Sequence, residues 1–128
     1  MKHEEFKLQK AVCLWLSYQY PETLFLSDTV ANMKLTPQAQ LRNKAIQKSG
    51  YSFPDLIIFE PRNGFHGLFL ELKIESPFKK GSECTVLKKN PHIETQHFTI
   101  EELKKRGYWG YFTWSFEMAK DMIDNYLK

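Results

Sequence analysis

The chain has 128 residues, 42% of them hydrophobic and 15% aromatic, and a formal net charge of +3. This composition excludes a disordered or fibrous protein, and the small positive charge permits a polyanionic partner without requiring one. We therefore expect a single globular domain over residues 1–128.

Targeting signals and cysteine frameworks are not evident. The amino-terminal segment is charged and lacks the apolar core of a secretory signal, and no apolar run approaches the roughly 20 residues that span a bilayer. Cys13 and Cys84 do not make a disulfide framework, so a reducing compartment is expected. These features predict a soluble, cytoplasmic protein that does not associate with membranes.

The first third of the chain predicts two helices and a short strand. Residues 3–19 are typical of an amphipathic helix. Its inward side is expected to carry Phe6, Gln9, Val12, Cys13, Trp15 and Leu16. Residues 24–31 are expected to form a strand. Thr36 before Pro37 predicts an N-cap with proline at the first helical position, and the helix is expected to end at Ser49-Gly50.

Residues 54–73 predict a β-hairpin. The runs LIIF (56–59) and GLFLEL (67–72) are rich in branched and aromatic residues, and Asn63-Gly64 lies between them. Both arms carry a carboxylate at their outer ends. A hairpin that only packed a core would need neither charge.

The rest of the chain predicts a lysine-rich, mobile loop and three further elements. The loop covers residues 78–89 and is of a kind that often contacts ligands. Asn90-Pro91 predicts the start of a helix that ends at Gly107. A strand is expected over residues 108–114, and Ser115 caps a last helix. The order α-β-α-β-β-α-β-α favours an α/β fold, with a central mixed β-sheet flanked by helices.

The register of the hairpin decides whether its two carboxylates meet. A strict two-residue turn at Asn63-Gly64 would place Asp55 opposite Leu72, on the wrong face of the sheet. A three-residue loop over 62–64, or an equivalent bulge, would place Asp55 opposite Glu71. We predict this second register.

Two carboxylates that face each other destabilise a sheet, since at about 4 Å they repel by roughly 4 kcal/mol at an effective dielectric near 20. A proton or a cation must relieve the repulsion, and Mg²⁺ suits a pair of oxygen ligands. Lys73, on the same face as Glu71, is placed to orient or deprotonate a metal-bound water. The alternative is a solvated ion pair on an edge strand that prevents aggregation.

These residues resemble a known family. Pro54-Asp55, followed after 15 residues by Glu71-Leu72-Lys73, resembles the PD-(D/E)XK nuclease superfamily. Within it, three further segments are similar to the VRR-NUC family of stand-alone viral-type and bacterial nucleases. They are Glu5 with Gln9 in the first helix, the stretch KSGYSFPDLIIF, and the carboxyl-terminal third from Gln96 onward. The resemblance spans about Glu5 to Leu127.

The resemblance implies a fold and a set of roles. It implies a PD-(D/E)XK nuclease-like fold with Asp55, Glu71 and the carbonyl of Leu72 as ligands of Mg²⁺ or Mn²⁺, and Lys73 as the residue that activates water. Glu5 would complete the acidic cluster directly or through water, although Glu4 competes for this role. Gln96 would support the site, and Gln9 is a weaker candidate for the same function. The family often has glycine where Phe53 stands, so a substrate would find less room at the backbone here.

Basic residues and the resemblance together predict the partner. Four lysines of the predicted loop are candidates for contacts with nucleic-acid phosphates: Lys79, Lys80, Lys88 and Lys89. Lys104, Lys105 and Arg106 form a second candidate patch, for which a solubilising role is an equal alternative. His66 is expected at the surface, and His92 and His97 have poor spacing for a metal.

The function that follows is a metal-dependent, structure-selective DNA endonuclease. The resemblance implies branched DNA such as Holliday junctions or flaps as substrate, and a homodimer as the assembly. No organic cofactor is expected. Two alternatives remain open: a catalytically inactive nucleic-acid-binding module with a relic acidic cluster, and an RNA-directed nuclease of the same superfamily.

Overall fold

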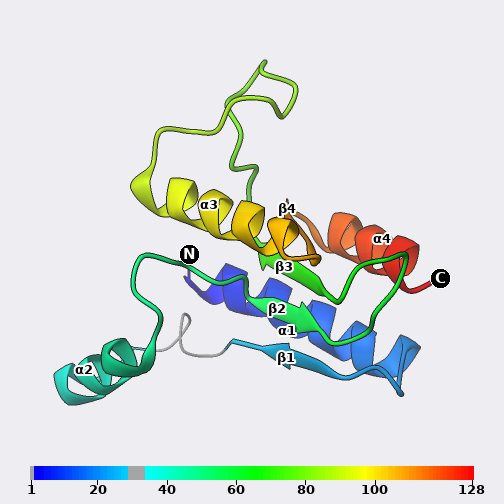
Figure 1. Ribbon diagram of the computed structural model, residues 1–128, viewed down its shortest axis with the longest axis horizontal. Coiled ribbons are helices and arrows are strands. Elements are labelled where there is room, and N and C mark those ends of the chain that lie inside the picture. Colours follow the sequence, from blue (N-terminus) through cyan, green and yellow to red (C-terminus); the bar gives the residue numbers. More distant parts are fainter. Residues whose placement is uncertain (1, 29–33) are drawn as a thin grey trace.

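The computed structural model describes residues 2–28 and 34–128, and the elements in these ranges follow the predicted order. Figure 1 shows a sheet with helices packed against it. The elements are α1 (Lys2–Gln19), β1 (Phe25–Ser27), α2 (Pro37–Ile46), β2 (Leu56–Ile58), β3 (Leu68–Leu72), α3 (Pro91–Lys105), β4 (Trp109–Thr113) and α4 (Phe116–Leu127). The predicted α/β class with a mixed sheet is confirmed.

The strands lie in the order β1-β2-β3-β4. The pairs β1–β2 and β2–β3 are antiparallel, whereas β3 and β4 are parallel. A parallel neighbour requires a crossover, and α3 supplies it between β3 and β4. The sheet is therefore mixed, and the carboxyl ends of β3 and β4 lie at the same margin.

The two faces of the sheet bury different sets of side chains. Leu68, Leu70 and Leu72 of β3 pack with residues of α1 and α4 in the larger core. Phe112 of β4 packs with Ile100 of α3 in a smaller core on the other face. Because side chains alternate along a strand, Glu71 lies on the α3 face, and in the register it pairs with Phe112. The sheet thus directs Glu71 toward α3.

The hairpin has the predicted register by way of a bulge. Leu56 pairs with Leu70 and Ile57 with Phe69, which places Asp55 opposite Glu71. At the tip, however, Arg62 and Phe65 bond to each other around a two-residue turn in which Asn63 and Gly64 both have positive φ. A three-residue loop is therefore wrong. Between the Ile58–Leu68 and Arg62–Phe65 pairs, the three residues 59–61 face only the two residues 66–67. The one extra residue of the bulge therefore lies in segment 59–61.

The helix starts are the predicted ones. Asn90 accepts hydrogen bonds from the backbone of His92 and Ile93, and Ser115 accepts one from Met118. Thr36 caps α2 in the same way through the Ala39 amide. These side chains satisfy amides that have no partner inside the helix.

Three predicted details are wrong. Phe6 is 48% exposed, because the packed part of α1 begins at Leu8. The helix α2 ends at Ile46 rather than near Gly50, and it has no buried residue. The strand predicted over 24–31 is limited to Phe25–Ser27 among the described residues, and positions 29–31 lie outside them.

The predicted loop, residues 78–89, extends away from the sheet (Figure 1). Its arms are tied by hydrogen bonds from the Lys79 amide to the Val86 carbonyl, 2.7 Å, and from the Lys88 amide to the Pro77 carbonyl, 2.9 Å. The loop is therefore a narrow, hairpin-like arm. In the described part of the chain, no helix is long and apolar enough to span a bilayer.

Candidate active site

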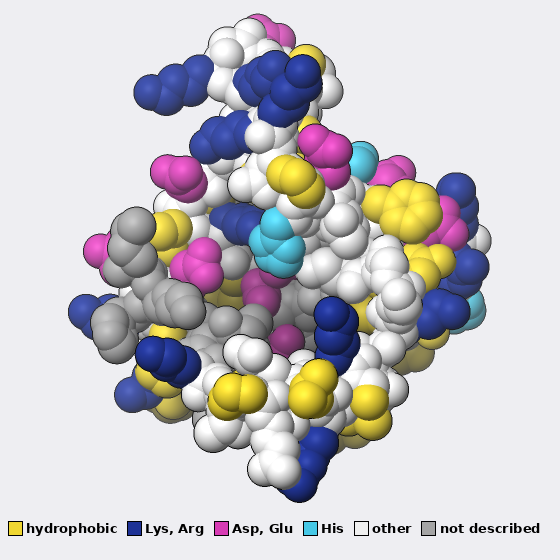
Figure 2. Space-filling model, turned by 90° about the vertical axis from the view of Figure 1, so that its left-hand side faces the viewer, with side chains coloured by type: hydrophobic (Ala, Val, Ile, Leu, Met, Phe, Trp, Pro, Cys, Tyr) yellow, Lys and Arg dark blue, Asp and Glu magenta, His cyan; other side chains and the backbone are white. Residues whose placement is uncertain are grey.

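A cavity of about 440 Å³ opens at the sheet margin where β2 begins and β3 ends. Its walls come from α1, the end of β1, α2, the segment before β2, and α3. All six residues predicted to form the catalytic and metal site line it: Glu5, Asp55, Glu71, Leu72, Lys73 and Gln96. Figure 2 looks into this margin and shows acidic side chains in a hollow, with lysine and arginine side chains around it and on the arm above.

Asp55 and Glu71 line the cavity from facing positions of the hairpin. Their side chains are close enough to share a hydrogen bond, as the register of the hairpin requires. The backbone amide of Leu72 donates a hydrogen bond of 2.9 Å to Asp55 Oδ2. Glu71 is only 3% exposed, and its buried Oε1 has no hydrogen-bond partner among the residues that the structure describes.

Burial raises the pKa of the Glu71 carboxyl well above its ordinary value. The hydrogen bond and the negative charge of Asp55 raise it further, and Glu5 adds a smaller effect in the same direction. Lys73 opposes them with its positive charge. The site therefore favours a proton or a cation beside Glu71.

Lys73 and Glu5 line the same cavity and are less buried than Glu71. Lys73 is partly buried, and its backbone amide bonds to the Thr113 carbonyl at 2.8 Å, which continues the β3–β4 pairing by one residue. Glu5 is exposed and lines the cavity from α1. Among residues 2–28 and 34–128, no three His, Cys, Asp or Glu side chains converge closely enough to hold a metal ion. Glu5 therefore does not complete a closed acidic cluster in this structure, and its water-mediated role remains a prediction.

Gln96 reaches the cavity from the buried side of α3. The side chain is 4% exposed, and its Nε2 lies 3.1 Å from Nε2 of His92. Its Oε1, like that of Glu71, is buried and has no hydrogen-bond partner in the described part of the chain. Two residues that line the same cavity therefore each carry one buried, unpartnered oxygen within that part of the chain.

The sequence analysis missed several residues that line the cavity, most of them polar. Asp28 follows β1, and its amide bonds to the Asp55 carbonyl at 2.8 Å. His92, rejected above for its spacing to His97, lies one helical turn before Gln96; that i, i+4 spacing was the available signal. The other residues missed are Asn43, Gln47, Lys48, Tyr51 and Ser52, whereas Phe53, already expected to limit the room for a substrate, also lines the cavity.

Gln9 has a different position from the catalytic candidates. Its Nε2 donates hydrogen bonds of 2.6 Å to the Ser27 hydroxyl and to the Asp28 carbonyl. It is buried and does not line the cavity. Gln9 therefore fixes the end of β1, next to the site.

The lysines proposed for nucleic-acid contacts lie on or beside the arm and do not line the cavity. Lys79, Lys80 and Lys89 are exposed, whereas Lys88 pairs with Glu75 at 3.5 Å. The second patch is neutralised by local ion pairs: Lys104 with Glu101, and Lys105 and Arg106 with Glu102. The arm is thus the stronger of the two candidate surfaces.

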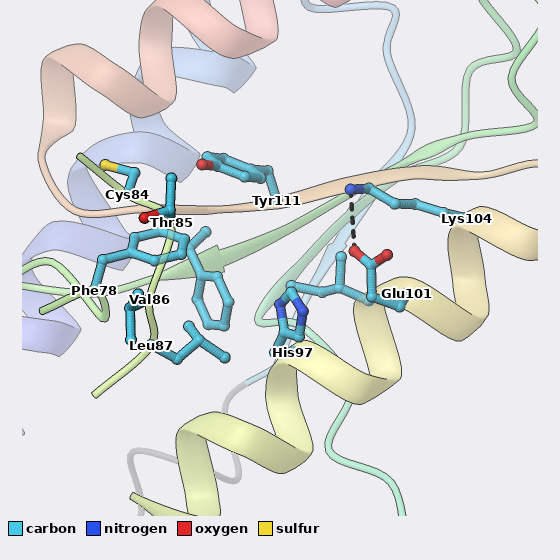
Figure 3. A pocket seen from close by; sticks show the side chains of 11 residues that line it. Phe78, Cys84, Thr85, Val86, Leu87, His97, Glu101, Lys104 and Tyr111 are labelled. Carbon is cyan, nitrogen blue, oxygen red and sulfur yellow. Dashed lines mark hydrogen bonds and ion pairs between the residues drawn. The ribbon is translucent and has the colours of Figure 1, made fainter. Parts of the chain in front are cut away.

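A second cavity, of about 400 Å³, lies between the arm, α3 and β4. Figure 3 shows apolar side chains such as Phe78 and Leu87 around it, with the Glu101–Lys104 ion pair of 3.2 Å on the α3 side. Its one carboxylate, Glu101, is already paired with a lysine. Acidic groups gather instead in the cavity at Asp55 and Glu71.

The donors at Asp55 and Glu71 fit a hard divalent cation. Such ions take carboxylate and carbonyl oxygens and keep several waters, so a site with few protein ligands suffices. A cation here would relieve the repulsion between Asp55 and Glu71 and would give Glu71 Oε1 the partner it lacks.

Comparison with known proteins supports the fold. No protein-family model and no curated protein matches this chain. A solved structure described as a "VRR_NUC domain protein" is similar, with a TM-score of 0.61, 23% sequence identity, and coverage of 96% of this chain and 87% of that one. The chain therefore has the fold of a VRR_NUC domain. In this chain, the mixed sheet brings Asp55 and Glu71 together at one margin.

Proposed function

We propose that this chain is a nuclease of the VRR-NUC family within the PD-(D/E)XK superfamily, that residues 1–128 form one catalytic domain, and that it hydrolyses DNA with Mg²⁺ or Mn²⁺. One observation carries the proposal. The paired carboxyls of Asp55 and Glu71, one with a buried oxygen that has no partner among the described residues, line an open cavity together with Lys73. The similarity to a VRR_NUC domain supports the assignment.

Each site residue has a proposed role. Asp55, Glu71 and the carbonyl of Leu72 would hold the ion, and Glu5 would act through a bound water. The ion, when bound, would supply a Lewis acid for the phosphate and lower the pKa of its water. Lys73 would orient the attacking water and stabilise negative charge that develops on the phosphate.

Neighbouring residues would hold this arrangement in place. The Leu72 amide fixes the Asp55 carboxylate, and Gln96, itself in contact with His92, presents an amide oxygen to the same cavity. Such preorganised groups contribute to rate because they do not have to reorganise during the reaction. Gln96 would therefore act as a positioning residue.

The arm would supply the electrostatic contact to DNA. Lys79, Lys80, Lys88 and Lys89 would bind backbone phosphates, which gives affinity and salt dependence but no base specificity. Branched DNA as substrate, a homodimer as assembly, and a cytoplasmic location belong to this proposal.

A cleavage panel tests the proposal. Four-way junction, flap, plain duplex and matched RNA substrates would be incubated with Mg²⁺, Mn²⁺ or EDTA. We expect metal-dependent cutting of DNA that falls by about 10²-fold or more in Lys73→Ala and Glu71→Gln. Lys10→Ala, an exposed lysine on α1 outside the cavity, is the matched control and should cut like the wild type.

The same panel separates the alternatives. Binding without cutting under every metal condition would overturn the enzyme and favour a binding module with a relic acidic cluster. Faster cutting of the RNA substrates would redirect the proposal to an RNA-directed nuclease. Equal cutting by wild type and Lys73→Ala would remove Lys73 from the mechanism.

A further inference from the structure

Three aromatic side chains form a partly exposed cluster that reaches the candidate active site through Tyr51 and Phe53. Tyr51 stacks with Phe53 at a ring-centroid distance of 6.0 Å and an interplanar angle of 21°, and it makes a tilted contact with Phe98 of α3 at 5.7 Å and 32°. Phe53 and Phe98 are 43% and 50% exposed. We name Tyr51, Phe53 and Phe98 the aromatic platform. Exposed apolar surface of this kind, gathered beside polar groups, is typical of a binding site.

The platform is continuous with the candidate active site. Tyr51 and Phe53 line the cavity that contains Asp55, and they also line a smaller cavity of about 240 Å³ against α3. Lys48 lines both cavities. Phe53 is two residues from Asp55 along the chain, so their Cα atoms lie within about 7 Å.

The segment that carries the platform is fixed. The Ser52 amide donates a hydrogen bond of 2.9 Å to the Thr99 hydroxyl, which joins the segment before β2 to α3. The tilted ring contact between Tyr51 and Phe98 joins the same two segments. Packing alone would explain Tyr51, which is partly buried, but it leaves large parts of Phe53 and Phe98 in water.

We propose that the aromatic platform binds an unpaired nucleobase of the strand whose phosphate occupies the candidate active site. This inference rests on the proposed nuclease function and narrows its substrate class. Every base has a π-face that stacks on aromatic rings whatever its sequence, and Lys48 is placed to bind the adjoining phosphate. Bases inside a continuous duplex are already stacked on each other and cannot reach the platform. The substrate therefore has a single-stranded or locally unpaired segment next to the cut.

Binding in EDTA tests the platform separately from cleavage. The probe is a single-stranded oligonucleotide that contains 2-aminopurine, whose fluorescence falls when the base stacks. We expect Phe98→Ala and Phe98→Leu to bind about tenfold more weakly and to lose this quenching. Phe98→Trp should restore both. Affinity for a blunt duplex should not change.

Two controls exclude a general effect. Phe59→Ala removes a phenylalanine that is equally exposed, at 51%, but has no ring contact with Tyr51 or Phe53, so it should bind the oligonucleotide like the wild type. Thermal unfolding of each variant shows whether the fold persists. Phe98→Leu keeps most of the apolar volume, and so separates loss of stacking from loss of packing.

The outcomes distinguish the platform from the nuclease. If the wild type cuts DNA but Phe98→Leu binds and quenches the oligonucleotide like the wild type, the platform is refuted and the nuclease stands. If quenching depends on Phe98 but no metal supports cutting, the platform stands and the nuclease is refuted. Equal weakening of oligonucleotide and duplex binding in Phe98→Leu would also overturn the platform.

Discussion

Replacing Glu71 with glutamine should stabilise the metal-free protein while lowering the proposed nuclease activity by about 10²-fold or more. Glu71 is 3% exposed, and among the described residues its Oε1 has no hydrogen-bond partner beside the carboxyl of Asp55. A glutamine of nearly the same shape carries no charge, and its amide can donate a hydrogen bond to Asp55. The variant therefore removes the repulsion and keeps a hydrogen bond between the two facing groups without needing a proton on residue 71.

The size of the effect follows from this geometry. The buried Oε1 keeps its environment in both forms, so the difference comes from the repulsion, which for two charges at about 4 Å is bounded by roughly 4 kcal/mol at an effective dielectric near 20. A proton on Glu71 relieves part of this repulsion at neutral pH. We expect a net gain of about 2 kcal/mol, or about 6–10 °C in Tm for a chain of this length.

Thermal unfolding with and without Mg²⁺ measures both parts of this prediction. In EDTA, Glu71→Gln should unfold at a higher temperature than the wild type. At a Mg²⁺ concentration of 100 Kd, the wild type should gain about 2.7 kcal/mol and the variant much less. Glu22→Gln, an exposed glutamate outside the cavity, should change neither curve. A variant that unfolds at a lower temperature than the wild type in EDTA would refute the reasoning.

Three further predictions concern pH and stability. The pKa of Glu71 is raised, so between the ordinary glutamate pKa and this raised pKa the folded state binds more protons than the unfolded state. The free energy of unfolding of the metal-free protein should therefore fall as the pH rises through this window. Urea unfolding in EDTA measures it. Gly107→Ala should cost at least about 1 kcal/mol in thermal unfolding, because φ is +94° and a Cβ would lie 2.6 Å from the His66 ring. Tyr20→Phe should cost about 1–2 kcal/mol, since the hydroxyl donates a 2.5 Å hydrogen bond to Asp124 Oδ1 and the pKa of Tyr20 is raised to about 12.

Each of these predictions has a matched control. Glu71→Gln should remove most of the pH slope, and an unchanged slope would assign it to other groups. Gly81 also has a positive φ but open space around it, so Gly81→Ala should cost less than Gly107→Ala. Tyr18, 88% exposed, should tolerate Tyr18→Phe, and an equal loss at Tyr20 and Tyr18 would contradict the role of the Asp124 bond.

The predicted site pair shows what alternation along a strand can decide. Asp55 and Glu71 could be placed on one face because side chains two residues apart point the same way and the two arms were recognisable. The choice of register needed one extra residue in the hairpin. The sequence analysis offered a three-residue loop or a bulge, and the bulge over 59–61 is observed beside a two-residue turn.

Other parts of the site depend on contacts that no local pattern records. Gln9 bonds to Ser27 and Asp28, 18 and 19 residues away, and Ser52 bonds to Thr99, 47 residues away. The burial of a helix face also depends on what covers it, which is why Phe6 is exposed although its periodicity matches the inward stripe. His92 also lines the cavity, although its spacing to His97 does not suit a metal site. Its position depends on how α3 packs over the sheet margin, which the spacing does not record.

The sequence by itself determined the order of the elements, the helix caps, and the placement of Asp55 and Glu71 on the same face of the sheet. Each of these depends on residues close along the chain or on the alternation of side chains in a strand. Only the tertiary structure decided the walls of the cavity, the position of Glu5 outside a closed cluster, and the exposure of Phe53 and Phe98. These follow from how α1, α3 and the segment before β2 pack around one sheet margin. Such packing is a property of surfaces that meet across the fold, and those surfaces are far apart in the chain.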